Sequence, residues 1–337
     1  MDGAARRAYK AYNDCLSFDT TFLTNRYKMP CAPFIGINNH GQSIQFGCGF
    51  LRDELSDSFV WLFKAFEQCV DGLAPLNIIT DQDFGMRGGI DKVFPNARHR
   101  NCRLHIVKNA QEVIGPLMSR NPALNEDFKD CLNNSFSPQE FETKWAAMIE
   151  SHGVQGNKDL AGLYEKRSWW IPAYFMQNFF PFMQTTARSE GFNAVLKQYV
   201  KPTNSVLEFV QQFQDIQEKY SSAEGKEEAT TLVTVATKWC HHPIEVQMSK
   251  TYTRGIYYRF QEEMQKLMSY NCHHVGGDNY ITECIAQFVP HYGTRSFNVI
   301  ANKAEERYEC ECCKMQRDGI LCCHILKVWQ FVFSVKG

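Results

Sequence analysis

The sequence lacks an excess of positive charge. Its 337 residues include 36 lysines and arginines against 37 aspartates and glutamates, which gives a formal net charge of −1. A protein that binds nucleic acid over its whole surface is normally basic. We therefore expect any DNA contact to be local, or to be made by a module that this chain lacks.

Long hydrophobic runs are also missing. The most apolar stretches, residues 59–66 and 171–183, are too short or too interrupted to cross a bilayer. Residues 1–13 contain three cationic side chains and no apolar centre, unlike a secretory signal. No internal repeat or low-complexity tract is visible. With 44% hydrophobic and 22% charged residues, we expect an intracellular globular protein of one large or two smaller domains, without membrane contact.

The fourteen cysteines do not suggest disulfides, because no secretory signal accompanies them. Nine of them are spread between Cys15 and Cys284, and five fall between Cys310 and Cys323. Reduced cysteines in so tight a cluster indicate a metal site.

The first hundred residues predict a mixed α/β sheet. Residues 16–18, 32–38 and 43–50 read as strands, and residues 39–42 form a hairpin turn between the last two. A helix follows from Ser56, its expected cap, to Gly72, with its apolar stripe on Phe59, Leu62, Phe63, Phe66 and Val70. Strand 76–80, helix 84–94 and strand 97–100 complete the pattern.

The rest of the chain alternates between helical and strand-like patterns. Residues 106–183 read as helical, and a helix from Ser189 ends before Pro202. Ser205 and Glu208 have capping-box spacing for a further helix, with Val206, Phe209, Val210, Phe213 and Ile216 facing inward. We expect a loop or hinge over residues 221–228, a helix over 256–270 and strands over 280–310.

The strongest chemical signal lies near the C-terminus. Three thiols and one imidazole form a complete tetrahedral set for structural Zn²⁺: Cys310, Cys312, Cys322 and His324. Residues 318–319 supply a turn between the two halves, and His324 opens an apolar helix. Cys313 and Cys323 are spare thiols that could replace a neighbour. The alternative is a set of buried free thiols, which we consider the weaker interpretation.

A trio of carboxylates gives a second signal. Asp19 and Asp81 each end a predicted strand, and Glu190 starts a helix. Three such acids can hold two Mg²⁺ or Mn²⁺ ions for phosphodiester chemistry. Each acid alone is equally typical of a turn or a helix start, so spacing by itself does not decide between these interpretations.

The most basic short segment spans residues 98–108. Its cations, Arg98, Arg100, Arg103 and Lys108, are candidates for phosphate contacts, although a solvated surface explains them equally well. Cys102 and His105 form a C-x-x-H pair within it. Zinc there would need partners such as residues 240–242 or 272–274, so we expect His105 to be hydrogen-bonded instead.

Several of these motifs, in this order, resemble the core of Mutator-like (MULE) transposases. They are Phe18-Asp19-Thr20-Thr21, Asn25-Arg26-Tyr27, residues 33–41, Thr80-Asp81-Gln82-Asp83, Phe94-Pro95 and residues 98–105. The cysteine cluster resembles the SWIM zinc finger, and residues 243–245, 252–253 and 260–263 resemble the stretch between core and finger. Over nearly its whole length the chain is similar to the plant far-red-impaired-response family of domesticated MULE transposases.

The resemblance implies an RNase H-like mixed sheet with a helical insertion, followed by a small C-terminal SWIM-type zinc finger. The implied division is core over 1–105, insertion over 106–185, core helices with the third acid over 186–220, a connecting region over 221–295 and the finger over 296–337. Asp19, Asp81 and Glu190 then match the ancestral acid trio, and Cys102 and His105 match the family's C-x-x-H element.

The same resemblance implies a nuclear regulator of transcription that binds zinc, DNA and transcription-related proteins and assembles with itself or with related family members. Because Asp19 follows the start so closely, we expect the family's N-terminal DNA-recognition domain to be absent from this chain. An active DDE-type transposase or nuclease is the alternative function, and we expect little transposition by this chain alone.

Overall fold

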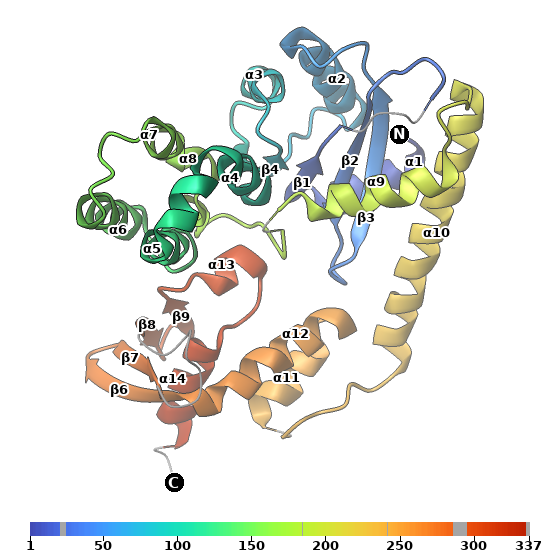
Figure 1. Cartoon of the computed structure of the whole chain (residues 1–337). Coiled ribbons are helices and arrows are strands. Elements are labelled where there is room, and N and C mark those ends of the chain that lie inside the picture. The colour runs from blue at the N-terminus through green and yellow to red at the C-terminus, as the bar shows by residue number, and fades with distance from the viewer. Residues whose placement is uncertain (21–24, 184, 241, 286–294, 335–337) are drawn as a thin grey trace. The chain divides into compact units, whose positions relative to one another are not determined.

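The computed structural model of the chain describes residues 1–20, 25–183, 185–240, 242–285 and 295–334. The chain forms two compact units, Met1–Lys226 and Glu227–Gly337 (Figure 1). Among the described residues, no helix is both long and apolar enough to cross a membrane.

A five-stranded mixed sheet forms the centre of the first unit. Its strands are β1 (Cys15–Phe18), β2 (Cys31–Ile37), β3 (Ser43–Phe50), β4 (Asn77–Thr80) and β5 (Arg98–Asn101). Their spatial order is β3-β2-β1-β4-β5, antiparallel from β3 to β1 and parallel from β1 to β5. The predicted RNase H-like mixed sheet is confirmed.

Three helices cover one face of this sheet: α1 (Gly3–Tyr12), α2 (Ser56–Cys69) and α3 (Phe84–Val93). The predicted apolar stripe of α2 is buried there, and Phe34 of β2 stacks on Phe66 with ring centroids 4.1 Å apart. The expected cap of α2 is wrong by one residue. Leu55 holds the extended cap position without a side-chain hydrogen bond, and Ser56 is the first helical residue.

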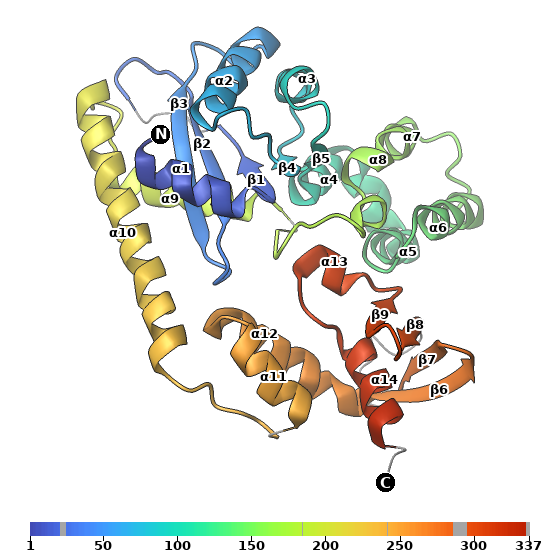
Figure 2. The same ribbon diagram turned by 180° about the vertical axis from the view of Figure 1, so that it is seen from behind.

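The opposite face carries α9 (Ala187–Tyr199) and the first half of α10 (Val206–Val233). Helix α9 lies in front of the sheet in Figure 1, whereas α1 lies in front of it in Figure 2. The first unit therefore has a helix–sheet–helix layering. In the core of this second face, Phe192 and Leu196 of α9 meet Ile35 of β2.

The predicted capping box opens α10. Glu208 accepts a hydrogen bond from the Ser205 amide at 2.6 Å, and the Glu208 amide donates to Ser205 Oγ at 3.3 Å. Of the five residues expected inside, Val206 and Val210 are exposed. The expected loop over residues 221–228 is also wrong, because α10 continues through them. Alanine, glutamate and lysine, which favour helices, make up much of that segment.

A helical insertion with its own core leads from β5 towards α9, as the sequence predicts. It comprises α4 (Arg103–Arg120), α5 (Pro122–Asn133), α6 (Pro138–Ser151), α7 (Lys158–Glu165), α8 (Arg167–Trp170) and the 3₁₀ turn η1 (Pro172–Phe175). Phe141, Trp145 and Trp170 are buried at its centre.

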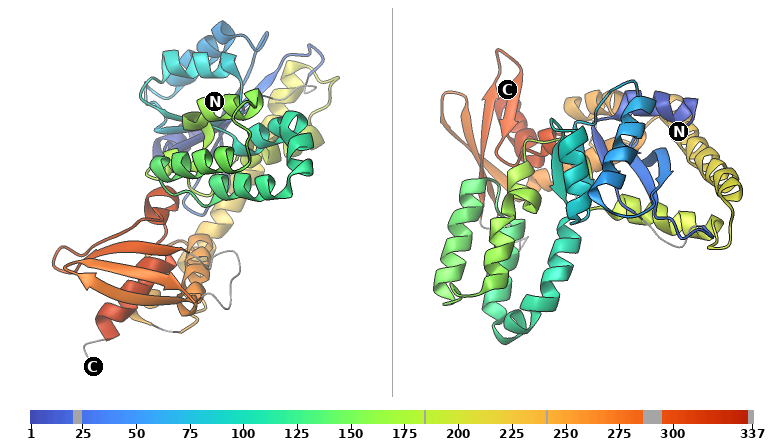
Figure 3. Two further views of the ribbon diagram at one scale, coloured as in Figure 1. Left: turned by 60° about the vertical axis from the view of Figure 1, so that its left-hand side comes forward. Right: turned by 90° about the horizontal axis from the view of Figure 1, so that it is seen from above.

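The second unit places helices before and after a small antiparallel sheet. The helical elements are α11 (Pro243–Thr251), α12 (Arg254–Gln265), η2 (Lys266–Ser269), α13 (Lys314–Asp318) and α14 (Cys323–Ser334). The strands are β6 (Tyr270–Gly276), β7 (Asn279–Cys284), β8 (Ser296–Asn302) and β9 (Arg307–Cys310), in that spatial order. Helix α14 lies across this sheet (Figure 3, left).

Candidate functional sites

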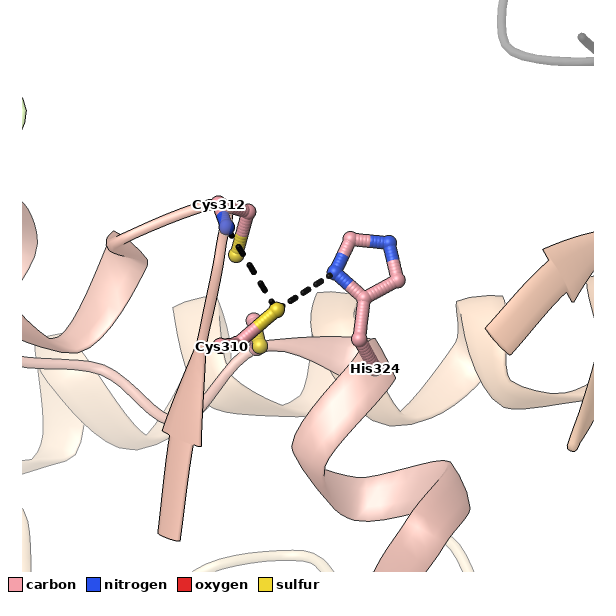
Figure 4. A group of neighbouring side chains, drawn as sticks. Cys310, Cys312 and His324 are labelled. Atoms are coloured by element: carbon pink, nitrogen blue, oxygen red, sulfur yellow. Dashed lines mark hydrogen bonds between the residues drawn. The ribbon is translucent and has the colours of Figure 1, made fainter. Parts of the chain in front are cut away.

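The four predicted zinc ligands converge in the second unit. Cys310 ends β9 and Cys312 follows it in a turn, while Cys322 immediately precedes α14 and His324 lies in its first turn. One ligand atom from each residue lies within 4.8 Å of all the others, and all four residues are buried. Cys310 Sγ contacts His324 Nδ1 at 3.5 Å and accepts the Cys312 amide at 3.5 Å (Figure 4).

The local chain geometry explains this convergence. Cys313 and Gly319 both adopt left-handed backbone conformations, with φ of 49° and 72°, and they flank the short helix α13. The two bends return the chain from β9 to α14, as the expected turn at residues 318–319 requires. His324 is fixed between Phe297, which stacks on it at 3.9 Å, and Tyr270, which meets it edge-on.

The donor set fits Zn²⁺. Three sulfurs and one imidazole nitrogen make a closed four-ligand set, typical of a structural site. Hydrogen bonds with Cys312 and Cys322 raise the pKa of Cys310, whereas hydrogen bonds from Cys310 and Cys312 lower the pKa of Cys322. The protonation of each thiol therefore depends on its neighbours, and a divalent cation in their centre would hold all three as thiolates.

A buried carboxylate supports the start of α14. Glu263 of α12 is 4% exposed, and one of its carboxylate oxygens accepts a hydrogen bond from the Cys323 amide at 3.1 Å. In sequence, Cys323 lies between the ligands Cys322 and His324. Lys266 and Lys314 lie 2.7 and 3.5 Å from the other oxygen of Glu263. Burial alone would raise the pKa of Glu263, but the two lysines and the amide outweigh it and hold the pKa below its ordinary value.

The acid trio lies at one edge of the mixed sheet in the first unit. Strands β1 and β4 pair in parallel with Phe18 opposite Thr80, so Asp19 and Asp81 leave the sheet side by side. Glu190 lies in the first turn of α9, and Asn193, one turn later, donates to Asp19 Oδ2 at 3.2 Å. The structure thus brings the three predicted acids together.

His105 lies between two of these acids. Its Nδ1 contacts Asp81 Oδ1, and its Nε2 lies 3.4 Å from Glu190 Oε1. The hydroxyl of Thr186 adjoins all three side chains, at 3.1 Å from Asp81, 3.3 Å from His105 and 3.2 Å from Glu190. His105 is therefore hydrogen-bonded, as expected. The backbone amide of Thr186 also donates to the Cys102 sulfur at 3.3 Å, so Cys102 lies beside the same residues.

Burial and neighbouring charges shift the pKa values of two of the acids. Burial raises the pKa of Asp19 to about 7, and the charge of Asp81 and, less strongly, that of Glu190 act in the same direction. Burial also raises the pKa of Asp81, against the opposing effects of His105 and Thr186. Asp19 therefore keeps its proton closer to neutral pH than a free aspartate does, and a bound cation would replace that proton.

The basic segment divides into exposed and buried cations. Lys108 and Arg98 are exposed, although Arg98 donates to the Tyr174 carbonyl. Arg103 donates to Asn133 Oδ1 at 2.8 Å. Arg100 is 1% exposed and packs on the rings of Phe175 and Phe180. The expectation that Arg100 contacts DNA is therefore wrong, since a buried guanidinium cannot reach a phosphate.

Two residues that contact the candidate sites were missed in the sequence analysis. Thr186 lies four residues before Glu190, and nothing in its spacing indicates contacts with Asp81, Cys102 and His105. Glu263 belongs to the stretch 260–263, which was used in the sequence analysis only for the family resemblance and was given no role there. His241, a candidate partner for Cys102 and His105, lies outside the described residues.

Comparison with protein-family models places two known domains on these sites. The MULE transposase domain matches residues 15–109, a range that includes Asp19, Asp81, Cys102 and His105. The SWIM zinc finger matches residues 297–330, which include all four ligands of the cysteine cluster.

Curated relatives match nearly the whole chain. Protein FAR1-RELATED SEQUENCE 5 of Arabidopsis thaliana is 33% identical over 331 residues, which cover 98% of this chain and 42% of the relative. Protein FAR-RED IMPAIRED RESPONSE 1 of the same plant is 30% identical over 332 residues, 98% of this chain and 40% of the relative. The chain therefore spans about two fifths of the length of these relatives.

Proposed function

This chain belongs to the far-red-impaired-response family of proteins derived from MULE transposases, and on that premise we propose that it acts in the nucleus as a regulator of transcription. The observation that carries the proposal is the similarity to these relatives over 98% of the chain, through both the core and the finger. The proposed partners are DNA, transcription-related proteins and related family members.

The two sites take different parts in this proposal. The buried Cys₃His cluster gives a closed zinc module, which leaves no position for a substrate and therefore suits a binding role. The mixed sheet with its helices serves as the scaffold. Exposed Arg98 and Lys108 remain the candidates for local phosphate contacts.

A tethered reporter assay tests the proposal, because it does not require the chain to find its own DNA site. The chain is fused to an unrelated DNA-binding domain in plant cells, and reporter transcription is measured. We expect a change in transcription that Cys312→Ser abolishes and Asp81→Asn preserves. An inert fusion, or one with the same activity in Cys312→Ser, would contradict the regulator role. A fluorescent fusion tests nuclear localisation.

Metal-dependent DNA cleavage is the second candidate function. Asp19 and Asp81 at neighbouring strand ends, with Glu190 beside them, favour it, because three such acids can hold two Mg²⁺ or Mn²⁺ ions. Purified chain and its Asp81→Asn variant are compared on supercoiled DNA with either ion. Metal-dependent strand transfer or nicking by the parent alone would establish the enzyme; equal, negligible activity would exclude it under those conditions.

A further inference from the structure

A second group of metal-binding side chains lies in the first unit, apart from the finger. Ligand atoms of Asp81, Cys102 and His105 all lie within 4.8 Å of one another. A tetrahedral zinc ion with bonds of 2.0 to 2.3 Å places its ligand atoms roughly 3.3 to 3.8 Å apart. The three donors are therefore close enough to share one ion after small side-chain adjustments.

The sheet and one helix create this juxtaposition. Strands β4 and β5 are parallel neighbours with Thr80 opposite Asn101, so Asp81 and Cys102 leave the sheet at the same edge. The Cys102 amide donates a hydrogen bond to the Thr80 carbonyl at 2.7 Å, which holds the ends of the two strands together. Cys102 precedes α4 and His105 lies in its first turn, a spacing that puts both side chains on one face.

The surroundings orient the donors. Cys102 is fully buried, and the Thr186 amide donates to its sulfur at 3.3 Å. Asp81 and His105 keep 29% and 26% of their side chains exposed, so the group is open on one side. Thr186 Oγ1 contacts both of them, and supporting hydrogen bonds of this kind are characteristic of metal ligands.

The chemistry of the donors selects the ion. Mg²⁺ and Ca²⁺ prefer oxygen ligands, whereas sulfur and imidazole favour Zn²⁺. We propose that Asp81, Cys102 and His105 bind a second zinc ion, with a fourth position open towards solvent and Glu190. Binding releases the thiol proton of Cys102 to solvent, and His105 binds through one ring nitrogen as a neutral imidazole that keeps its N–H on the other; no bond to carbon changes.

A zinc ion on Asp81 would compete with the Mg²⁺ ions that the acid trio could hold. Both kinds of ion would need the same Asp81 carboxylate as a ligand. Because Mg²⁺ does not favour thiolate, millimolar Mg²⁺ is expected to leave this zinc in place. The inference is independent of the regulator role, since it concerns occupancy of the core and not transcription.

Metal analysis of the full-length chain tests the proposal. The chain is equilibrated with Zn²⁺, freed of excess by gel filtration, and its zinc counted by plasma mass spectrometry. We expect about two zinc ions per chain, about one in Cys102→Ser, His105→Gln and Asp81→Asn, and about one in Cys312→Ser. Cys131→Ser, which removes a buried thiol of the helical insertion, should keep both.

A spectroscopic arm distinguishes ligation from loss of folding. After substitution with Co²⁺, the thiolate charge-transfer absorption of Cys102→Ser should be lower than that of the parent by the contribution of one thiolate, whereas Cys131→Ser should leave the absorption unchanged. Circular dichroism checks that each variant is folded. If Cys102→Ser unfolds, the zinc content of Asp81→Asn decides the question instead. One zinc per chain in the parent, with the same count in all three core variants, would overturn the proposal.

Discussion

The hydroxyl groups of Ser17 and Ser189 lie 2.6 Å apart in the core of the first unit, and both residues are 0% exposed. Ser17 belongs to β1 two residues before Asp19, and Ser189 belongs to α9 immediately before Glu190. One buried hydrogen bond between side chains therefore joins the strand that leads to the first acid to the helix that carries the third.

Removing either hydroxyl is expected to destabilise this junction. Ser17→Ala or Ser189→Ala leaves a buried hydroxyl without its partner, which costs about 1–3 kcal/mol, whereas the double variant removes both groups and costs less than the sum. Native-state hydrogen exchange of β1 and α9 peptides measures the free energies. Exposed Ser221→Ala serves as the control. Additive effects of the two single substitutions would contradict a shared hydrogen bond.

The second prediction concerns how folding stability depends on pH through the raised pKa of Asp19. Its folded value of about 7 lies above the ordinary 3.8, so the folded state keeps a proton that the unfolded state loses between about pH 4 and pH 7. Stability is therefore expected to fall as pH rises through that window and to level off above it. Asp19→Asn should reduce this pH dependence, as followed by hydrogen exchange of β1, and the part that remains comes from Asp81, whose pKa is also raised.

Carbon NMR of selectively labelled aspartate measures the Asp19 pKa directly. Asp81→Asn should lower it by removing a neighbouring negative charge, and Glu190→Gln should lower it less. Asp57→Asn on α2, which changes a fully exposed carboxyl, should leave it unaltered. An Asp19 pKa near 4 in the parent would contradict the burial of this carboxyl and its interaction with the neighbouring acids.

Loss of zinc from the finger is the third prediction. Cys312→Ser and His324→Ala should each lower the zinc content by one ion, and hydrogen exchange should rise in β9, α13 and α14, because ion binding supplies much of the folding energy of such modules. Cys313→Ser is the matched control, since its thiol lies outside the ligand group and contacts the Glu311 carbonyl. Equal loss in Cys313→Ser would make Cys313 a ligand.

Local patterns predicted much of the fold. The alternation around residues 32–50 and the stripe on α2 reflect burial on one face, which periodicity records directly. The capping box of Ser205 and Glu208 involves only neighbours in sequence and was also predicted correctly. The zinc site in the cysteine cluster could be predicted from the sequence because zinc requires particular residue types at close spacing.

Ambiguous local composition and long-range contacts account for the predictions that failed. Residues 221–228 have the small, charged composition of a loop, yet α10 continues through them because that composition also favours helix. Arg100 looked like a surface cation, but β5 turns it into the core against Phe175 and Phe180. Thr186 joins Asp81 and Cys102 from about a hundred residues away, which spacing cannot reveal.

Glu263 is the subject of the last prediction. It joins α12 to the start of α14 through the Cys323 amide, directly between the ligands Cys322 and His324. We therefore expect it to position those ligands, although it lies outside the SWIM match at residues 297–330. Glu263→Ala should weaken zinc binding about 10- to 100-fold, as loss of a supporting carboxylate does at other metal sites.

Chelator competition on the full-length chain measures this effect. Glu263→Gln, which keeps an oxygen for the Cys323 amide but loses its charge beside Lys266 and Lys314, should lie between Glu263→Ala and the parent. Glu262→Ala changes the exposed neighbour on the same helix and should bind zinc like the parent. If Glu263→Ala lowered thermal stability but left the zinc affinity and the Co²⁺ spectrum of the finger unchanged, Glu263 would support the fold of α14 without positioning its ligands.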